Sequence, residues 1–170
     1  SRTSKVTEEW GPRKLAAIMS IDIVGYSAIA EIDEAEAAGA VALVRDALDK
    51  VSAKQGGRIF NTAGDGFMVE FASAAGALAA VEDFWASVER TRVRVGMHVG
   101  DVILLRNGDL LGHSVNVAAR LQQMAQPGGA VVSMDVRRAV RGKLAQRLHA
   151  AGAVHLDKMS EPMEIFTFEA

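Results

Sequence analysis

The feature that most constrains the fold of this chain is a hairpin signal between two amphipathic segments. Residues 58–71, RIFNTAGDGFMVEF, contain two strand-like runs that meet at Gly64-Asp65-Gly66. In the second run, aromatic and aliphatic residues alternate with a period of two, which is typical of a half-buried strand. Asp-Gly between two such runs is the strongest short-range signal of a tight turn. We therefore predict an antiparallel hairpin with Asp65 at its tip.

The segments on both sides of this hairpin have the apolar period of helices that pack on a sheet. Residues 34–54 form the first segment, and Gln55-Gly56-Gly57 is expected to end it. Residues 74–88 form the second, with Ser73 as the predicted N-cap. The two stripes consist of Val41, Val44, Leu48 and Val51, and of Ala74, Leu78, Val81, Trp85 and Val88.

Further strand-like and helical segments flank this unit. Strands are predicted over 14–24, over 92–105 with an interruption at Gly100-Asp101, over 130–134 and over 161–170, and helices over 113–126 and 134–148. The order β-α-β-β-α-β is that of the split βαβ motif. We therefore predict an α+β fold, with a ferredoxin-like βαββαβ core, appended strands and helices, and a mostly antiparallel sheet.

The composition is that of one globular domain. The chain has 170 residues, of which 49% are hydrophobic and 24% charged, enough for a packed core. We predict that residues 15–170 form this domain and that 1–14 are a linker or N-terminal extension. The formal net charge of −2 argues against binding nucleic acid, and no apolar run approaches the roughly 18 residues needed for membrane insertion. Cysteine is absent, which excludes disulfides and thiolate sites.

Asp22 is unusual because apolar residues flank it in the predicted strand SIDIVGYS. A lone buried carboxylate costs several kcal/mol unless it is paired or binds a metal. An alternative is a strand-end cap, since Gly25 and Ser27 mark a bend. In a split βαβ sheet the first strand lies beside the central hairpin, so Asp22 and Asp65 are expected to face the same point. Such oxygen ligands suit Mg²⁺ or Mn²⁺ rather than zinc.

The segment GHSVNVAAR contains a third candidate feature. Asn116 and Arg120 are four residues apart and therefore lie on one helix face. An arginine fork beside an amide suits a phosphate and a sugar hydroxyl, although a solvated pair has the same spacing. Upstream, Val24 to Ser27 could open a helix whose free N–H groups would bind phosphate. None of the histidines has zinc-ligand spacing, so we predict surface or hydrogen-bonded core roles for His98, His113, His149 and His155.

Together, these motifs resemble those of the class III nucleotidyl cyclase catalytic domain, the adenylate and guanylate cyclase family. SIDIVGYS is similar to the first metal-aspartate motif, NTAGDGFMVEF to the second, and LLGHSVNVAARL to the Gly-x-x-Val-Asn-x-Ala-x-Arg helix. The resemblance runs from about Leu15 to Phe168. It implies that the ribose 3′-oxygen of a nucleoside triphosphate attacks its own α-phosphate, giving a 3′,5′-cyclic monophosphate and pyrophosphate.

The resemblance also implies roles for individual residues. Asp22 and Asp65, with the backbone carbonyl of Ile23, would hold two Mg²⁺ or Mn²⁺ ions per active site. The triphosphate would lie against the turn formed by Gly25, Tyr26 and Ser27. Arg120 would stabilise the transition state, and Asn116 would orient the ribose. Because the family's sites form between subunits, a homodimer with two composite sites is implied.

Purine selection in this family depends on two side chains, which are usually Lys and Asp in adenylate cyclases and Glu and Cys in guanylate cyclases. The corresponding residues are Asn61 and Asp109. Asp109 can accept a hydrogen bond from the adenine amino group, whereas Asn61 can donate or accept. ATP is therefore the expected substrate, and adenylate cyclase the expected activity.

Two further positions depart from the family pattern. The triphosphate-binding lysine falls on Asp157 in an ungapped alignment, and Lys158, one residue along, is the candidate. The segment between Gly100 and Gly112 is short for the family's dimerisation arm, which implies the compact-arm subgroup.

Two alternatives to an adenylate cyclase stay open from the sequence. One is a guanylate cyclase, and another is a catalytically weak cyclase-like domain that binds nucleotide and regulates. A diguanylate cyclase would need a Gly-Gly-Asp/Glu-Glu-Phe signature, which is missing. We expect a cytoplasmic catalytic domain joined to an upstream regulatory domain, through which the full-length protein could be membrane-attached.

Overall fold

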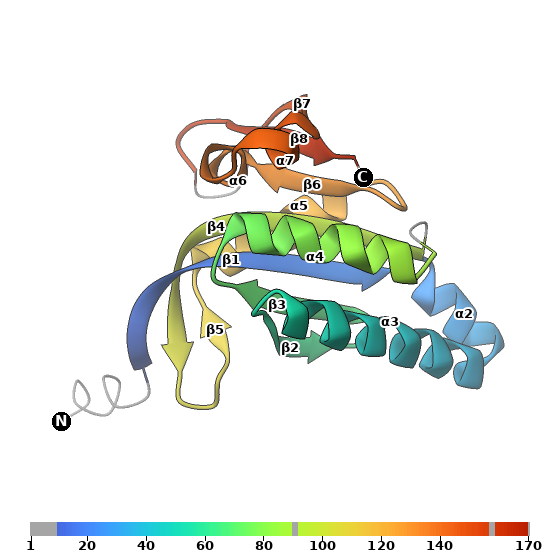
Figure 1. Ribbon diagram of the computed structural model, residues 1–170. Coiled ribbons are helices and arrows are strands. Elements are labelled where there is room, and N and C mark those ends of the chain that lie inside the picture. Colours follow the sequence, from blue (N-terminus) through green and yellow to red (C-terminus); the bar gives the residue numbers. More distant parts are fainter. Residues whose placement is uncertain (1–9, 90–91, 157–158, 170) are drawn as a thin grey trace.

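The computed structural model describes residues 10–89, 92–156 and 159–169, which form an eight-stranded sheet with helices on both faces (Figure 1). In chain order the elements are β1 Trp10–Ile23, α2 Tyr26–Ile32, α3 Glu34–Lys54, β2 Arg58–Ala63, β3 Gly66–Phe71, α4 Ala74–Ser87, β4 Val93–Leu105, β5 Leu110–Leu111, α5 His113–Met124, β6 Ala130–Ser133, α6 Met134–Ala139, α7 Gly142–Gln146, β7 Leu148–Val154 and β8 Met163–Phe168. Among the helices of the described ranges, none is both long enough and apolar enough to cross a bilayer.

The sheet has the strand order β2-β3-β1-β4-β6-β8-β7, and β5 pairs with β4. The long strand β1 lies between β3 and β4 and is antiparallel to both. Among the described strands, only the β4–β6 pair is parallel. The order β2-β3-β1-β4 is that of a split βαβ core. The predicted α+β fold with a mostly antiparallel sheet is therefore confirmed.

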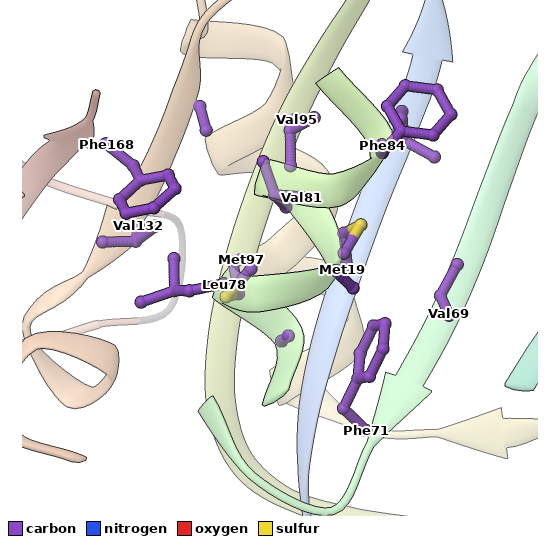
Figure 2. Packing of buried hydrophobic residues seen from close by; sticks show 14 of the residues in the cluster. Met19, Val69, Phe71, Leu78, Val81, Phe84, Val95, Met97, Val132 and Phe168 are labelled. Atoms are coloured by element: carbon purple, nitrogen blue, oxygen red, sulfur yellow. The ribbon is translucent and has the colours of Figure 1, made fainter. Parts of the chain in front are cut away.

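Alternation along β1 sorts its side chains onto two faces of the sheet. The odd-numbered residues face α3 and α4, where Met19 packs with Leu78 and Val81 in the main core (Figure 2). The even-numbered residues face the side on which α5 packs, where Ala16 and Ile18 form a smaller cluster with Ala118, Val102 and Leu110. Asp22 continues this even-numbered series, so it lies on the α5 face.

The predicted hairpin and the two helices that flank it are confirmed. Helix α3 covers residues 34–54 and ends at the predicted Gln55. Ser73 caps α4, because its hydroxyl accepts a hydrogen bond from the Gly76 amide at 3.0 Å. The turn of the hairpin contains Gly64 with a φ of 60°, a left-handed conformation that glycine adopts without strain.

The expected interruption of the strand at Gly100-Asp101 is wrong. Strand β4 is continuous because β1 pairs with it through Ala16↔Gly100 and Leu15↔Asp101. Strand β1 also begins earlier than residue 14, at Trp10. Gly100 marks a close approach instead, since a Cβ there would lie 2.1 Å from the Ser114 hydroxyl oxygen.

The single helix predicted over 134–148 is also wrong. Val140 and Arg141 are extended, and Gly142 has a φ of 67°, so the segment forms two short helices, α6 and α7. Strand β7, which follows them, was not predicted, because its residues are mostly exposed and lack an apolar alternation. Its pairing with β8 shifts register between Ala150 and Ala153, around Gly152 with a φ of 99°.

Gly96 allows α5 to lie directly on β4. A Cβ at this position would lie 2.1 Å from the Gln122 amide nitrogen and 2.4 Å from the Ala118 carbonyl oxygen. Both are backbone atoms of the helix, so the whole helix would have to shift. The closeness of α5 to the sheet therefore depends on this glycine.

We predict that Gly96→Ala lowers the free energy of unfolding by about 3 kcal/mol, because overpacking would displace α5 from β4. The control is Gly39→Ala in α3, where no atom lies within 4 Å of an added Cβ. That change should raise stability by roughly 0.5–1 kcal/mol, since alanine is the better helix former. Urea denaturation measures both, and equal effects would contradict the close packing at Gly96.

Candidate active site

Asp22 lies near the end of β1, opposite Gly66 of β3 and Arg94 of β4. Its side chain is 28% exposed, but its Oδ1 atom is buried and has no hydrogen-bond partner among the described residues. The nearest cation is Arg94, whose Nε lies 4.0 Å from that oxygen. The carboxylate therefore has an oxygen without a hydrogen bond near the C-terminal end of β1.

Asp65 is brought to the same place by the hairpin turn. The Ile23 amide donates a hydrogen bond to the Asp65 carbonyl oxygen at 3.3 Å, which joins the end of β1 to the hairpin tip. Burial raises the pKa of Asp22, the Gln122 side chain and Arg94 lower it, and the negative charge of Asp65 raises it. The net shift is upward, so the ionised carboxylate of Asp22 lacks sufficient positive charge around it.

These groups fit a divalent cation. A buried oxygen without a partner, a second carboxylate beside it and the adjacent backbone of Ile23 offer only hard oxygen ligands, which Mg²⁺ and Mn²⁺ prefer. Within residues 10–89, 92–156 and 159–169, no group of three or more His, Cys, Asp or Glu side chains forms a metal cluster. Mg²⁺ sites commonly use one or two carboxylates and take their other ligands from water and substrate phosphates.

The turn after β1 contains Gly25, Tyr26 and Ser27. Gly25 has a φ of 71° and caps α2, and no atom lies within 4 Å of where its Cβ would be. Ser27 is exposed, whereas Tyr26 packs partly against the main core. The turn therefore leaves open space beside the aspartates.

The predicted Asn–Arg pair lies on the solvent-exposed side of α5. The buried residues of this helix are Ser114, Val117, Ala118, Leu121 and Gln122. Successive helical residues are about 100° apart, so the exposed Asn116 and Arg120 lie opposite this buried stripe. Gln122 approaches Asp22, and Asn116 and Arg120 are therefore turned away from the aspartates of their own chain.

Asn61 of β2 and Asp109 of the turn between β4 and β5 contact each other although they are 48 residues apart. The Asn61 Nδ2 atom donates to Asp109 Oδ2 at 3.2 Å. The other carboxylate oxygen, Oδ1, accepts from the Leu110 amide at 2.8 Å. Both side chains are therefore held by hydrogen bonds.

A β-bulge directs Asn61 toward Asp109. Ile59 pairs with Val69, but the next pair is Asn61 with Met68, so Phe60 is an extra residue in β2. Phe60 and Met68 both pack against the cluster on the α5 face. Without the extra residue, alternation would place Asn61 on the opposite face. This bulge was not predicted from the sequence, because no turn or glycine signal marks it.

Four polar side chains near the candidate residues were not predicted from the sequence. Arg94 and Gln122 approach Asp22, and Arg58, paired with Glu70, bonds the backbone of Gly108 beside Asp109. Predicting these contacts from the sequence would have required knowing which strands are neighbours in the sheet. His98 is a hydrogen-bonded core residue as predicted, with Nδ1 2.8 Å from the Ser133 hydroxyl, and burial lowers its pKa. Lys158 lies outside the described residues.

The fold and these side chains together are those of a nucleotidyl cyclase catalytic domain. The chain belongs to the family described as the adenylate and guanylate cyclase catalytic domain, whose model matches residues 11–170. The resemblance inferred from the motifs is confirmed.

Individual relatives agree with this assignment. A Rhizobium meliloti (strain 1021) protein named "Putative adenylate cyclase 3" is 34% identical over 167 residues, covering 92% of this chain and 28% of that protein. A Silicibacter pomeroyi structure titled adenylate/guanylate cyclase/hydrolase has a TM-score of 0.77 at 27% identity, covering 93% of this chain and 98% of that one. The adenylyl cyclase CyaB from P. aeruginosa shares the fold, with a TM-score of 0.81 at 22% identity over 94% of this chain and 95% of that one.

We predict that Asp22→Asn raises the free energy of unfolding in buffer without divalent cations by roughly 1 kcal/mol, because the amide removes a charge that burial and Asp65 disfavour. Asp49→Asn on the exposed side of α3 is the control and should change stability little. Thermal or urea unfolding gives both values. A destabilised Asp22→Asn variant would show that the carboxylate is well compensated in the fold.

Proposed function

We propose that this chain is the catalytic domain of an adenylate cyclase that converts ATP to 3′,5′-cyclic AMP and pyrophosphate. In this reaction the ribose 3′-oxygen forms a bond to the α-phosphorus, and the bond from that phosphorus to the pyrophosphate oxygen breaks. The observation that carries the proposal is that Asp22 and Asp65 lie together at one end of β1, where a buried oxygen of Asp22 has no hydrogen-bond partner among the described residues.

Asp22, Asp65 and the Ile23 carbonyl would hold two Mg²⁺ or Mn²⁺ ions in this proposal. When bound, such ions supply positive charge that acidifies the attacking hydroxyl and offsets charge on the leaving group. The triphosphate would lie against the adjacent turn of Gly25, Tyr26 and Ser27, where no atom lies within 4 Å of a Cβ built on Gly25. The candidate triphosphate lysine is Lys158.

The Asn61–Asp109 hydrogen bond supports ATP over GTP. An ionised carboxylate is acceptor-only, so Asp109 orients the Asn61 amide with its NH₂ group toward the carboxylate. The second N–H of Asn61 is then a donor for adenine N1, and Asp109 is an acceptor for the adenine 6-amino group. Guanine presents O6 where adenine has that amino group, which would place two acceptors against each other. In this proposal Asn61 therefore acts as a donor toward the base.

The exposed side of α5 supports a composite site. Asn116 and Arg120 point away from the aspartates of the same chain, so a second copy would have to supply them. We propose a homodimer with two equivalent sites, in which Arg120 stabilises charge on the transferred phosphoryl group and Asn116 orients the ribose. Preorganised donors of this kind typically contribute about 3 kcal/mol each.

The proposal also concerns the protein outside this domain. The chain spans 28% and 36% of the lengths of two curated relatives that it matches. A regulatory region joined to this domain and a cytoplasmic position with access to ATP are part of the proposed function.

The test is incubation of the purified chain with ATP or GTP and Mn²⁺, followed by quantification of cyclic nucleotide and pyrophosphate. We expect cyclic AMP from ATP, less product from GTP, and loss of product with a chelator. Asp22→Ala and Asp65→Ala should abolish turnover while circular dichroism stays unchanged. Preferential turnover of GTP would make the domain a guanylate cyclase, and nucleotide binding without product would make it a regulatory domain.

Subunit complementation tests the composite site. Asp65→Ala and Arg120→Ala homodimers should each be inactive or lose at least about 100-fold in kcat. A mixture of the two should recover roughly one quarter of wild-type activity, because half of the dimers contain one site with both residues intact. Arg120→Ala mixed with Asn116→Ala is the control, since both substitutions affect the same half and no intact site forms. Failure of the first mixture to recover activity would place the site within one chain.

A further inference from the structure

Arg58 of the outer strand β2 bonds to the backbone of the turn between β4 and β5. Arg58 Nη2 donates to the Gly108 carbonyl oxygen at 2.5 Å, across 50 residues of sequence. Within the turn, the Gly108 amide donates to Leu105 at 3.0 Å and the Leu105 amide donates to Asp109 at 2.9 Å. The Arg58 contact therefore joins a locally closed turn to a different part of the sheet.

Arg58 is in turn held by a buried carboxylate. Its Nε donates to Glu70 Oε1, and Glu70 Oε2 lies 2.9 Å from Lys14 Nζ. The Glu70 side chain is only 11% exposed, whereas that of Arg58 is 43% exposed. The pairs Arg58↔Glu70 and Ile18↔Glu70 place this carboxylate in β3, between β2 and β1. Glu70 thus fixes the Arg58 guanidinium group at Nε, and this orientation points Nη2 at the Gly108 carbonyl of the turn.

The anchored positions are close in sequence to both proposed base-reading residues. Asp109 directly follows Gly108, and Asn61 comes three residues after Arg58. The Asn61–Asp109 distance of 3.2 Å thus depends on how the turn sits against β2. Within the described residues, the Arg58–Gly108 and Asn61–Asp109 contacts are the side-chain hydrogen bonds that join this turn to β2.

We infer that Arg58, held by Glu70, is a positioning residue that sets the purine preference of the site by fixing Asp109 against Asn61. The inference rests on the proposed function, in which Asn61 and Asp109 read the base. Arg58 acts through the Gly108 carbonyl, two bonds from the Asp109 nitrogen, and touches neither base-reading side chain. Loss of the anchor would let the turn move away from β2 and let Asn61 rotate its amide.

The experiment measures kcat/KM for ATP and GTP in wild type, Arg58→Ala, Glu70→Gln and Arg58→Lys. Arg58→Ala should lower the ATP-to-GTP ratio about tenfold, mainly through a higher KM for ATP, because base contacts contribute uniform binding. Glu70→Gln should lower the ratio less, since it keeps an acceptor for Arg58. Arg58→Lys should be intermediate, because lysine cannot bind Glu70 and Gly108 as a fork.

Lys54→Ala is the matched control, because it removes an ion pair with Asp83 at 3.5 Å that joins α3 to α4 and includes no residue of the turn. Its ratio should equal that of wild type. An Arg58→Ala ratio equal to that of Lys54→Ala would overturn the inference. A tenfold lower ratio with unchanged kcat for ATP would support it, whereas a general loss of kcat with an unchanged ratio would show a structural role only.

Hydrogen exchange separates this inference from the proposed function. The amides of Leu105, Gly108 and Leu110 are bonded within the turn. They should exchange about tenfold faster in Arg58→Ala than in Lys54→Ala, while amides of the β1–β4 ladder stay unchanged. If wild type makes no cyclic nucleotide, the proposed function fails even when these amides respond. If wild type is active and these amides do not respond, the positioning role of Arg58 fails.

Discussion

The pairing of β1 with both β3 and β4 is the constraint on which the rest of the structure depends. It fixes which residues of β1 face α3 and α4 and which face α5, because alternation allows only two choices. The same register sets Asp22 opposite Arg94 and Gly66, at the point where the hairpin tip arrives. Strand β1, which is apolar and buried on both faces, thus places the Asp22 carboxylate near its end, where burial raises the pKa of that carboxyl.

The two proposed base-reading residues bind each other before any base arrives. Asn61 and Asp109 satisfy part of each other's hydrogen bonding, and the Leu110 amide and Arg58 limit how the loop can move. Such preorganisation reduces the entropy lost when a ligand binds. The hydrogen bond to Asp109 also fixes the orientation of the Asn61 amide, so that its NH₂ group acts as a donor. A lysine at that position would be a donor because of its charge.

The elements predicted correctly from the sequence are those with local signals. The Asp-Gly turn, the Ser73 cap and the stripes of α3 and α4 each depend on residues within a few positions of one another. The bulge at Phe60, the Glu70–Arg58 contact and the approach of Arg94 to Asp22 depend on register between strands, which no short stretch encodes. A glycine in the sequence does not say which structural feature requires it. Gly100 allows a close approach of Ser114, whereas Gly142 adopts a left-handed conformation between two short helices.

Strand β7 forms one border of the sheet, and its pairing with β8 is broken between Ala150 and Ala153. Its outward backbone groups would otherwise be a template for a strand from another molecule. The left-handed Gly152 twists this border, so an incoming strand would find no continuous row of partners. Extension of the sheet by a strand from another molecule is thereby discouraged along β7.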